Sequence, residues 1–280
     1  RRAVWASSTA VVCNTTRSVA GEVRVEVSNN GREYTSDGVR LQLVSVRVVE
    51  VQPWSGPVLG ATVVSVRGRG LLAGELQCRF GESDGAMAWS GGASRLRCAS
   101  APSAVTGWVG VQLSSFYGAL SSGGSFYYHA PLVASALTPA LGPERGGTRV
   151  TVLGSFFRDA YTLRCRFENA SAAVLARYVD DNQLECSSPV HSLGPKRLML
   201  SMNGQQYDEG TLTFTYQAAA AVSSVSPASA LAEGGTPVTV HGAHFSAASE
   251  ALGLLLCRIG STVRRAVWAS STAVVCNTTR

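Results

Sequence analysis

The stretch LVASALTPALGPERGGTRVTVLGSFF, residues 132–157, decides the fold class of this chain. It contains a short apolar run, a proline, a glycine-bearing turn and the alternating run Val150–Leu153, which Gly154 ends. Short alternating runs bounded by Gly and Pro predict β-strands with one buried face. The pattern recurs in VVEVQPWSGPVLGATVVSVRGRGLL from Val48 and in AVSSVSPASALAEGGTPVTVHGAHFS from Ala221. The chain is therefore expected to consist of repeats of an all-β unit.

Each repeat carries two cysteines at a nearly constant separation. The first lies in LQCRFGES, LRCRFENAS or LLCRIGST, and the second follows 20, 21 or 19 residues later in RLRCASAPS, QLECSSPVH or AVVCNTTR. Three recurrences favour disulfides over buried free thiols, and closing a loop of about 20 residues contributes on the order of 3 kcal/mol. Cys13 is the counterpart of Cys276, so its expected partner precedes Arg1. The predicted pairs are Cys78–Cys98, Cys165–Cys186 and Cys257–Cys276.

The two ends of the chain are identical. RRAVWASSTAVVCNTTR forms residues 1–17 and again residues 264–280, so one full period is 263 residues. Three repeats of roughly 88 residues fit into this period, and that size is typical of a β-sandwich. We therefore expect the back part of one domain, two complete domains and the front part of another, at residues 1–45, 46–131, 132–217 and 218–280.

Two interpretations explain the identical ends. In the favoured one, the natural polypeptide repeats this three-domain block, and the 280 residues are a window whose ends fall within domains. In the other, the front half-domain is completed by the N-terminal half of the next copy, which produces a head-to-tail fibre. The overlap disfavours the second interpretation, because it supplies the Cys13 strand twice at every junction.

Three N-x-S/T sequons lie beside the cysteine segments, at Asn14, Asn169 and Asn277. A sequon alone is a weak signal. Next to a disulfide framework, however, it favours a secreted and N-glycosylated surface. We therefore expect the chain to be extracellular or exposed at the cell surface.

These residues resemble the IPT/TIG family of immunoglobulin-like domains, which occurs in plexins, in transcription factors and in the hepatocyte growth factor receptor class. The resemblance rests on GGT.VTV.G..F in two repeats, the CRF or CRI segment, the second cysteine followed by SSP or ASAP, and a closing FTY or FYY. It covers essentially the whole chain and implies tandem immunoglobulin-like β-sandwiches in a rod-like array. In the first complete repeat, Gly60-Ala61-Thr62 replaces Gly-Gly-Thr and Leu71 replaces the aromatic residue, which predicts a different turn and packing there.

The sequence predicts no catalytic residue, no metal site and no cofactor. It contains no GxSxG, HExxH or P-loop pattern, and no CxxC supports a zinc site. His241 and His244 are three residues apart at a strand end, where their side chains point in different directions and lack a third ligand. Asp180-Asp181-Asn182 lacks the alternating ligands and central glycine of a calcium loop, so it predicts a polar turn.

The composition of the chain limits the classes of partner that are expected. Hydrophobic residues make up 45% of the chain and charged residues 15%, which is typical of a folded protein. No apolar run approaches about 18 residues, so no membrane span is expected in this segment. The net charge of +6 is spread along alternating strands, which favours a solvated sheet face, so no nucleic acid partner is expected. Trp5, Trp54 and Trp108 are interpreted as residues of core or inter-domain packing rather than as glycan or partner contacts.

The favoured function is a non-enzymatic structural or adhesive array outside the cell, in the form of a fibre, a surface coat or a stalk. Its expected partners are further copies of itself and, in addition, a glycan or a cell-surface protein. Repetition without sequence change favours this function, because identical blocks present the same surface at a fixed spacing. One alternative is a receptor-type ectodomain that binds a protein ligand. The less favoured alternative is a nuclear Rel-like module for DNA binding and dimerisation, which requires a reducing compartment.

Overall fold

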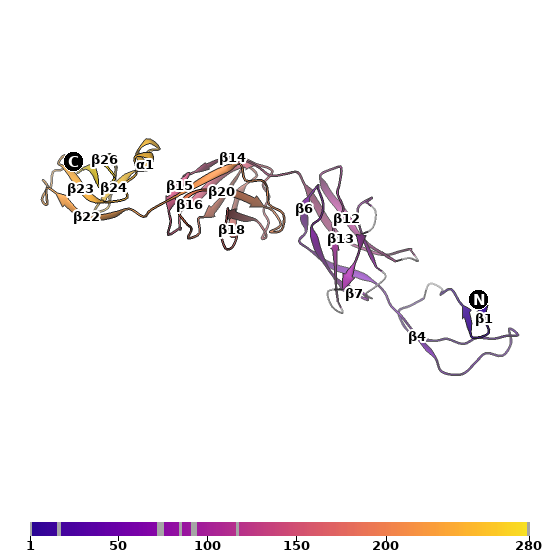
Figure 1. Ribbon diagram of the computed structural model, residues 1–280. Helices are drawn as coiled ribbons and strands as arrows, with labels where there is room; N and C mark the ends of the chain where they lie inside the picture. The colour runs from indigo at the N-terminus through magenta and orange to yellow at the C-terminus, as the bar shows by residue number, and fades with distance from the viewer. Residues whose placement is uncertain are drawn as a thin grey trace. The chain divides into compact units, whose positions relative to one another are not determined.

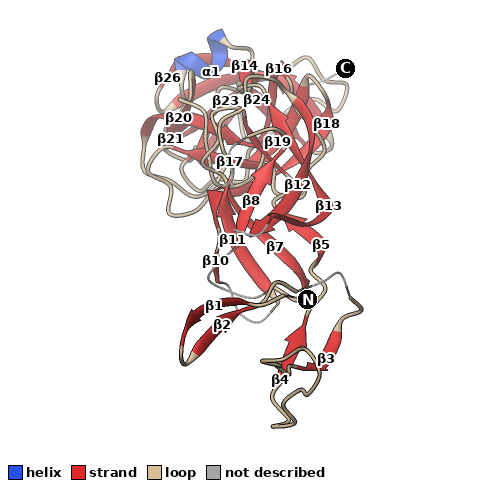
Figure 2. Ribbon diagram, turned by 90° about the vertical axis from the view of Figure 1, so that its right-hand side faces the viewer, coloured by secondary structure: helices blue, strands red, loops and turns tan. Residues whose placement is uncertain are grey.

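The computed structural model describes residues 2–15, 18–71, 76–83, 86–90, 94–115 and 118–278, and it consists mainly of short β-strands. Within these ranges the chain has one α-helix, α1 (Ala247–Ala251), which is drawn in blue in Figure 2. Ser246 caps this helix, because its hydroxyl accepts a hydrogen bond from the amide of Ser249. The predicted all-β, immunoglobulin-like fold class is confirmed.

Residues 132–217 contain a full set of eight strands. The strands pair in the order β14-β16-β19-β18-β17-β20-β21-β15 and lie together in Figure 1. Neighbours are antiparallel except β15 and β21, which are parallel. The bounds are β14 (Val133–Thr138), β15 (Leu141–Pro143), β16 (Arg149–Ser155), β17 (Arg164–Phe167), β18 (Val174–Asp180), β19 (Gln183–Ser187), β20 (Gly194–Ser201) and β21 (Leu212–Gln217).

Alternation along these strands builds the core. On β16, Val150 and Val152 are fully buried, whereas Leu153 is exposed. Phe167 from β17 meets Phe214 from β21 edge to face, with ring centroids 5.5 Å apart. Because each strand buries every second side chain, one face of the sheet is apolar. The removal of this face from water drives folding.

The Gly-Gly-Thr sequence forms a tight turn before β16. Gly146 and Gly147 have φ angles of 71° and 82°, a region that glycine enters without steric cost. The amide of Gly147 donates to the carbonyl oxygen of Ser188 at 2.8 Å, and the amide of Thr148 donates to the Ser188 hydroxyl at 3.1 Å. The turn thus joins β16 to the segment after the second cysteine.

The first complete repeat keeps this turn, so the prediction of a different turn is wrong. Ala61 has a φ of 60°, and its amide donates to the carbonyl oxygen of Ser100 at 2.8 Å. The amide of Thr62 donates to the Ser100 hydroxyl at 3.1 Å. The packing beneath the turn is also the same in kind. Leu71 is buried, and it lies 3.2 Å from the position that a Cβ on Gly68 would take, just as Phe157 lies close to that position on Gly154. The two hydrogen bonds offset the cost of a left-handed alanine, about 1 kcal/mol.

The glycine after the alternating strand is required by close packing. A Cβ at Gly154 would lie 2.1 Å from the carbonyl oxygen of Val133, and one at Gly242 would lie 1.9 Å from that of Ala221. The pairing of β14 with β16 slips at the same point, as at a β-bulge. A side chain at either position would force the strands apart.

Residues 46–131 pair into two sheets, in the orders β10-β11-β7-β5 and β6-β13-β12-β8-β9. Phe126 packs edge to face against Phe80 at 5.2 Å, as Phe214 does against Phe167. The two repeats therefore place aromatic rings alike. The bounds are β5 (Arg47–Gln52), β6 (Ser55–Pro57), β7 (Val63–Arg69), β8 (Gln77–Phe80), β9 (Ala86–Met87), β10 (Trp89–Ser90), β11 (Arg95–Ala99), β12 (Gly107–Ser115) and β13 (Gly118–His129).

Residues 218–278 contain two smaller sheets, in the orders β22-β23-β27-β26 and β24-β25. Their core is small and centres on Phe245, Ala266, Val274 and Cys276. These strands correspond to the part of a repeat that ends with its second cysteine. The bounds are β22 (Ala221–Ser226), β23 (Pro237–Ala243), β24 (Leu256–Ile259), β25 (Thr262–Arg265), β26 (Val267–Ser270) and β27 (Ala273–Asn277).

The N-terminal segment forms two hairpins. Strand β1 (Val4–Ser7) pairs with β2 (Ala10–Val12), and β3 (Gly21–Arg24) pairs with β4 (Arg40–Leu43), both antiparallel. None of the described residues before Val48 is buried. Strand pairing in this segment is therefore present without a core of its own.

Candidate interaction surfaces

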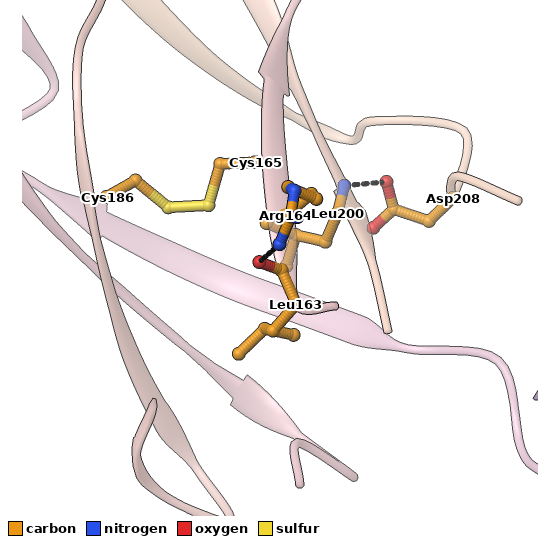
Figure 3. The surroundings of a disulfide bond; sticks show 6 residues. All are labelled: Leu163, Arg164, Cys165, Cys186, Leu200 and Asp208. Atoms are coloured by element: carbon orange, nitrogen blue, oxygen red, sulfur yellow. Dashed lines mark hydrogen bonds between the residues drawn. A yellow bond between two sulfur atoms is a disulfide. The ribbon is translucent and has the colours of Figure 1, made fainter. Parts of the chain in front are cut away.

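Disulfides join the two cysteines of each repeat. Cys165 on β17 is bonded to Cys186 on β19 (Figure 3). These strands are not neighbours in the sheet, so the bond ties two layers together around the core. Cys13 is free and exposed. The three bonds, Cys78–Cys98, Cys165–Cys186 and Cys257–Cys276, have Cα–Cα distances of 6.2, 6.3 and 6.1 Å.

A carboxylate close to the second disulfide closes the β20–β21 hairpin. Asp208 Oδ1 accepts a hydrogen bond of 2.8 Å from the amide of Leu200 (Figure 3), and the Asp208 amide donates to the Leu200 carbonyl at 3.0 Å. Burial raises the pKa of Asp208, while hydrogen bonds from the amides of Leu200 and Gly210 oppose the rise. The role of this acid is to hold the backbone.

The histidine pair and the Asp-Asp-Asn sequence, the two candidates for metal binding, lie at the surface and in a turn. His241 and His244 are exposed, and His244 has a φ of 63°. Asp180 and Asn182 form a turn in which the Asn182 amide donates to Asp180 Oδ1 at 2.8 Å. Across the described ranges, no group of three or more His, Cys, Asp or Glu side chains is placed to hold a metal ion.

The other two histidines are held by main-chain carbonyls. His129 is 7% exposed, its Nδ1 lies 2.8 Å from the carbonyl oxygen of Ala130, and burial lowers its pKa. His191 stacks on Tyr216 with ring centroids 4.9 Å apart, and its Nε2 lies 2.8 Å from the carbonyl oxygen of Glu168. Both imidazoles therefore have structural contacts.

The predicted glycosylation sites lie on the surface. Asn14, Asn169 and Asn277 are all exposed. Asn169 occupies the turn after β17, with a φ of 62°. An exposed turn is a suitable acceptor for a bulky glycan. Glycan attachment at these three asparagines stays a prediction.

An exposed aromatic cluster lies on the first complete repeat. Trp54 and Trp108 stack with ring centroids 5.5 Å apart, and Trp108 meets the edge of Tyr127 at 5.3 Å. Trp108 is 63% exposed, and the other two rings are half-buried. Tryptophan and tyrosine are the residues enriched at the energetic centres of protein interfaces. We call Trp54, Trp108 and Tyr127 the Trp108 surface.

Trp108 is not a core residue of its repeat, so the part of the prediction that places it in a core is wrong. The alternation of residues along β12 indicates that Trp108 is exposed, because Val111 and Leu113 are buried and Gln112 is half-buried. Trp108 shares the parity of Gln112, which places it on the outer face. Trp5 is also exposed, at 73%.

The second surface is an apolar groove within residues 220–278. In the complete repeat, Phe167 follows the first cysteine by two residues and is fully buried, whereas the equivalent Ile259 is 44% exposed. Apolar surface that is left open to water is unfavourable and often marks a contact site. We call this feature the β24 groove. It has a volume of about 450 Å³ and its lining includes Val225, Val240, Phe245, Leu255, Cys257 and Ile259.

Sequence comparison identifies the family. The profile of the IPT/TIG domain matches residues 132–216 and 220–280, just over half of the chain, and the chain belongs to this family. Human Plexin-A3 is 26% identical over 217 residues, which cover 73% of this chain and 11% of that protein. Mouse Plexin-A2 is 29% identical over 117 residues, which cover 41% of this chain and 6% of that protein. The chain thus spans about a tenth or less of the length of the curated relatives it matches.

A solved structure shares the fold. The full extracellular region of plexin A4 is similar with a TM-score of 0.52 and 18% identity, covering 90% of this chain and 22% of that one. With the disulfides, these similarities identify this chain as extracellular or exposed at the cell surface. In the part of the chain that the structure describes, no helix is both long enough and apolar enough to cross a membrane.

Proposed function

We propose that this chain is a non-enzymatic stretch of the extracellular region of a receptor-type protein, and that it binds a protein ligand through the Trp108 surface. The observation that carries the proposal is the stacked, 63% exposed Trp108 on a disulfide-linked sandwich. The similarity to plexins over most of the chain supports the receptor-type role. We further propose that the domains are residues 1–45, 46–131, 132–217 and 218–280.

The chemistry of the Trp108 surface suits a protein partner. Stacking with Trp54 and contact with Tyr127 hold the Trp108 ring in one orientation, so little side-chain entropy is lost on binding. Burying an aromatic anchor of this kind accounts for about 2 kcal/mol or more in a typical interface, as measured by truncation to alanine. Aromatic rings also stack on sugars, so a surface glycan is the competing ligand.

The test uses fluorescent tetramers of the full chain on a panel of intact cells. We expect binding to be lost after surface proteolysis and to survive removal of glycans. The variant Trp108→Ala is expected to weaken binding at least about tenfold, which corresponds to 1.4 kcal/mol. Trp89→Ala is the matched control, because Trp89 is also exposed, at 44%, but lies outside the Trp108 surface. Full binding by Trp108→Ala, or loss of binding after glycan removal alone, would contradict the proposal.

A structural array is the second candidate function. It is favoured by the identical residues 1–17 and 264–280, because a repeated block presents the same surface at a fixed spacing. Chains or blocks that join end to end can form a stalk or a fibre whether or not a ligand binds. Electron microscopy of the purified chain tests it, because an array requires end-to-end strings and a pure ligand-binding module does not.

A further inference from the structure

Five arginines of the first complete repeat gather on one face of a sheet. Strands β5, β7 and β11 lie side by side (Figure 2), with β7 in the middle. Val48, Val66 and Leu96 point from these strands into the core and are buried. The arginines occupy the alternate positions of the same strands and are all exposed. We call this set the arginine face, and it consists of Arg47, Arg67, Arg69, Arg95 and Arg97.

The strand register places like charges directly opposite one another. Arg47 on β5 faces Arg69 on β7. Arg67 on β7 faces Arg95 on β11. Like charges at directly opposite positions of neighbouring strands repel each other, so both pairs oppose folding. Among the described residues, the face has one ion pair, between Arg67 and Glu50 at 3.7 Å, so most of its positive charge is uncompensated.

The fold itself does not require arginine at these positions. The two arginine pairs have counterparts at the same register in the other repeats, namely Val133–Ser155 and Leu153–Gln183 in residues 132–217 and Ala221–Ala243 and His241–Ala273 in residues 218–278. The counterpart of Arg97 is Glu185, the residue before the second cysteine. Because the same strands form without any of these arginines, packing does not explain why one repeat carries all five.

The five charges form a continuous row across three strands. Arg67 and Arg69 are two residues apart on β7, and each faces an arginine on a different neighbouring strand. Arg97 extends the row by two residues along β11. From the strand spacing and the rise per residue, the row is roughly 17 Å long from Arg47 to Arg97. A row of this length suits a chain molecule that carries negative charges on successive units rather than one small anion.

We propose that the arginine face binds a sulfated polysaccharide outside the cell. Guanidinium groups donate paired hydrogen bonds to anionic oxygens, and arginine is the residue favoured where such planar recognition matters. A densely charged polymer also releases counterions when arginines bind it, which adds to the free energy of binding. All the positive side chains of residues 46–131 are arginines, with no lysine among them.

The extracellular location decides between the classes of polyanion. Three disulfides and the similarity to plexins place the chain outside the cell, where nucleic acid is not the ordinary polyanion. Protein surfaces usually intersperse both signs of charge. A sulfated polysaccharide has negative groups alone, so it compensates five neighbouring arginines better than the surface of an acidic protein does.

This inference does not rest on the proposed function. The arginine face belongs to the sheet that contains β5, β7 and β11, whereas Trp108 and Tyr127 belong to β12 and β13 of the other sheet. Loss of either surface therefore leaves the other in place. Removal of glycans should weaken the attachment of tetramers to cells without abolishing it, because the Trp108 surface contacts protein.

The first experiment measures binding of the full chain to immobilised heparin, a heavily sulfated polysaccharide, over a range of salt concentrations. Cys13→Ser in every variant prevents cross-linking by the exposed thiol. Arg69→Gln with Arg95→Gln removes one arginine from each like-charge pair. This double variant should lower the affinity roughly tenfold, and the slope of the logarithm of affinity against the logarithm of salt concentration should fall by about one to two.

The matched control removes the same charge from the next repeat. Arg145→Gln with Arg149→Gln changes two exposed arginines of residues 132–217 and should keep the affinity within about twofold of the parent. Equal losses in the two double variants would mean that net charge alone drives binding, which overturns the proposal. Failure of the parent chain to bind heparin at low salt overturns it as well.

Stability separates a lost contact from a lost fold. Because Arg69→Gln and Arg95→Gln each relieve a repulsion, the melting temperature of the double variant should stay the same or rise. Glu50→Gln acts in the opposite direction on binding, since it removes the carboxylate beside Arg67 and should raise the affinity about two- to threefold. Glu82→Gln changes the net charge equally but follows β8 of the other sheet, and it should leave the affinity unchanged. Equal gains in these two single variants would refute the assigned face.

Competing probes identify the chemistry of the ligand. Desulfated heparin and polyglutamate of matched length should each displace the chain from heparin at least about tenfold less well than free heparin does. Equal competition by polyglutamate would assign the face to an acidic protein segment, and equal competition by desulfated heparin would show that sulfate is not recognised. Either result overturns the proposal. Trp108→Ala should bind heparin like the parent, so failure of this inference and failure of the proposed function can be told apart.

Discussion

Gly154→Ala adds one carbon atom at the point where β16 passes β14. The new Cβ would lie 2.1 Å from the carbonyl oxygen of Val133 and 2.5 Å from the ring of Phe157. Since real Cβ atoms essentially never come within 3.0 Å of another heavy atom, the carbonyl has to retreat by about 0.9 Å. That carbonyl belongs to a paired strand, so the shift disturbs the edge of the sheet and the fully buried Phe157 together.

The expected cost is the sum of two effects. Overpacking of a filled site costs about 1–3 kcal/mol, and a disturbed backbone hydrogen bond adds about 1 kcal/mol. We therefore expect Gly154→Ala to lower the free energy of unfolding by about 2–4 kcal/mol. Gly147→Ala is the matched control, because nothing lies within 4 Å of its new Cβ and Ala61 already occupies that place in the first repeat. Its left-handed φ costs about 1 kcal/mol, partly offset by the stiffer unfolded chain.

Hydrogen exchange of the β16 amides in the full chain measures both variants. Residues 132–217 contain no tryptophan, so intrinsic tryptophan fluorescence does not report on this body. The free energy of opening under native conditions should fall by about 2 kcal/mol more in Gly154→Ala than in Gly147→Ala. Equal effects, or a loss below about 1 kcal/mol in Gly154→Ala, would refute the argument that close approach fixes this glycine.

Three further predictions concern the disulfide, a buried imidazole and the core residue Leu200, whose counterpart Val27 lies 173 residues earlier, the interval that also separates Cys13 from Cys186. Replacing Cys165 and Cys186 together by Ser should lower the free energy of unfolding by about 3 kcal/mol in urea titrations, because the closed loop is lost. Burial lowers the pKa of His129 below its ordinary 6.5, so the unfolded chain takes up a proton first as the pH falls. Stability should therefore decline below a pH of about 6.5 in melting curves, and His129→Phe should flatten that decline. Leu200→Ala should cost about 2–5 kcal/mol by hydrogen exchange, whereas Val27→Ala should cost less than about 0.5 kcal/mol, because Val27 is not part of a buried core.

The sequence alone predicts the local structure of this chain, namely its strands, its turns and its cysteine pairs. Alternation predicted strands such as β16, and the glycine pattern predicted the turn at Gly146 and Gly147. The cysteine spacing predicted pairs that the structure contains, such as Cys165 with Cys186. These features depend on neighbours in the chain or on a repeated interval, so the order of residues carries them.

The candidate surfaces needed the tertiary structure. Trp54, Trp108 and Tyr127 come from distant parts of one repeat, and no spacing in the sequence places their rings together. The prediction of a different turn at Ala61 is wrong because it rests on residue type alone, whereas the amides of Ala61 and Thr62 donate hydrogen bonds to Ser100 that stabilise the turn. Contacts between residues far apart in sequence decide which side chains meet.

The identical ends of the chain show which features the sequence alone determines and which depend on the tertiary structure. In both copies the hairpin has the same register, with Trp5 opposite Val11 and Trp268 opposite Val274. Trp5 is 73% exposed, whereas Trp268 is half-buried and its Nε1 donates to the carbonyl of Phe245 at 3.1 Å. The pairing of a hairpin is set by its own alternation and turn, so identical letters form it twice. Burial requires a partner from elsewhere in the chain, so the same residues lie in a core at one end and in water at the other.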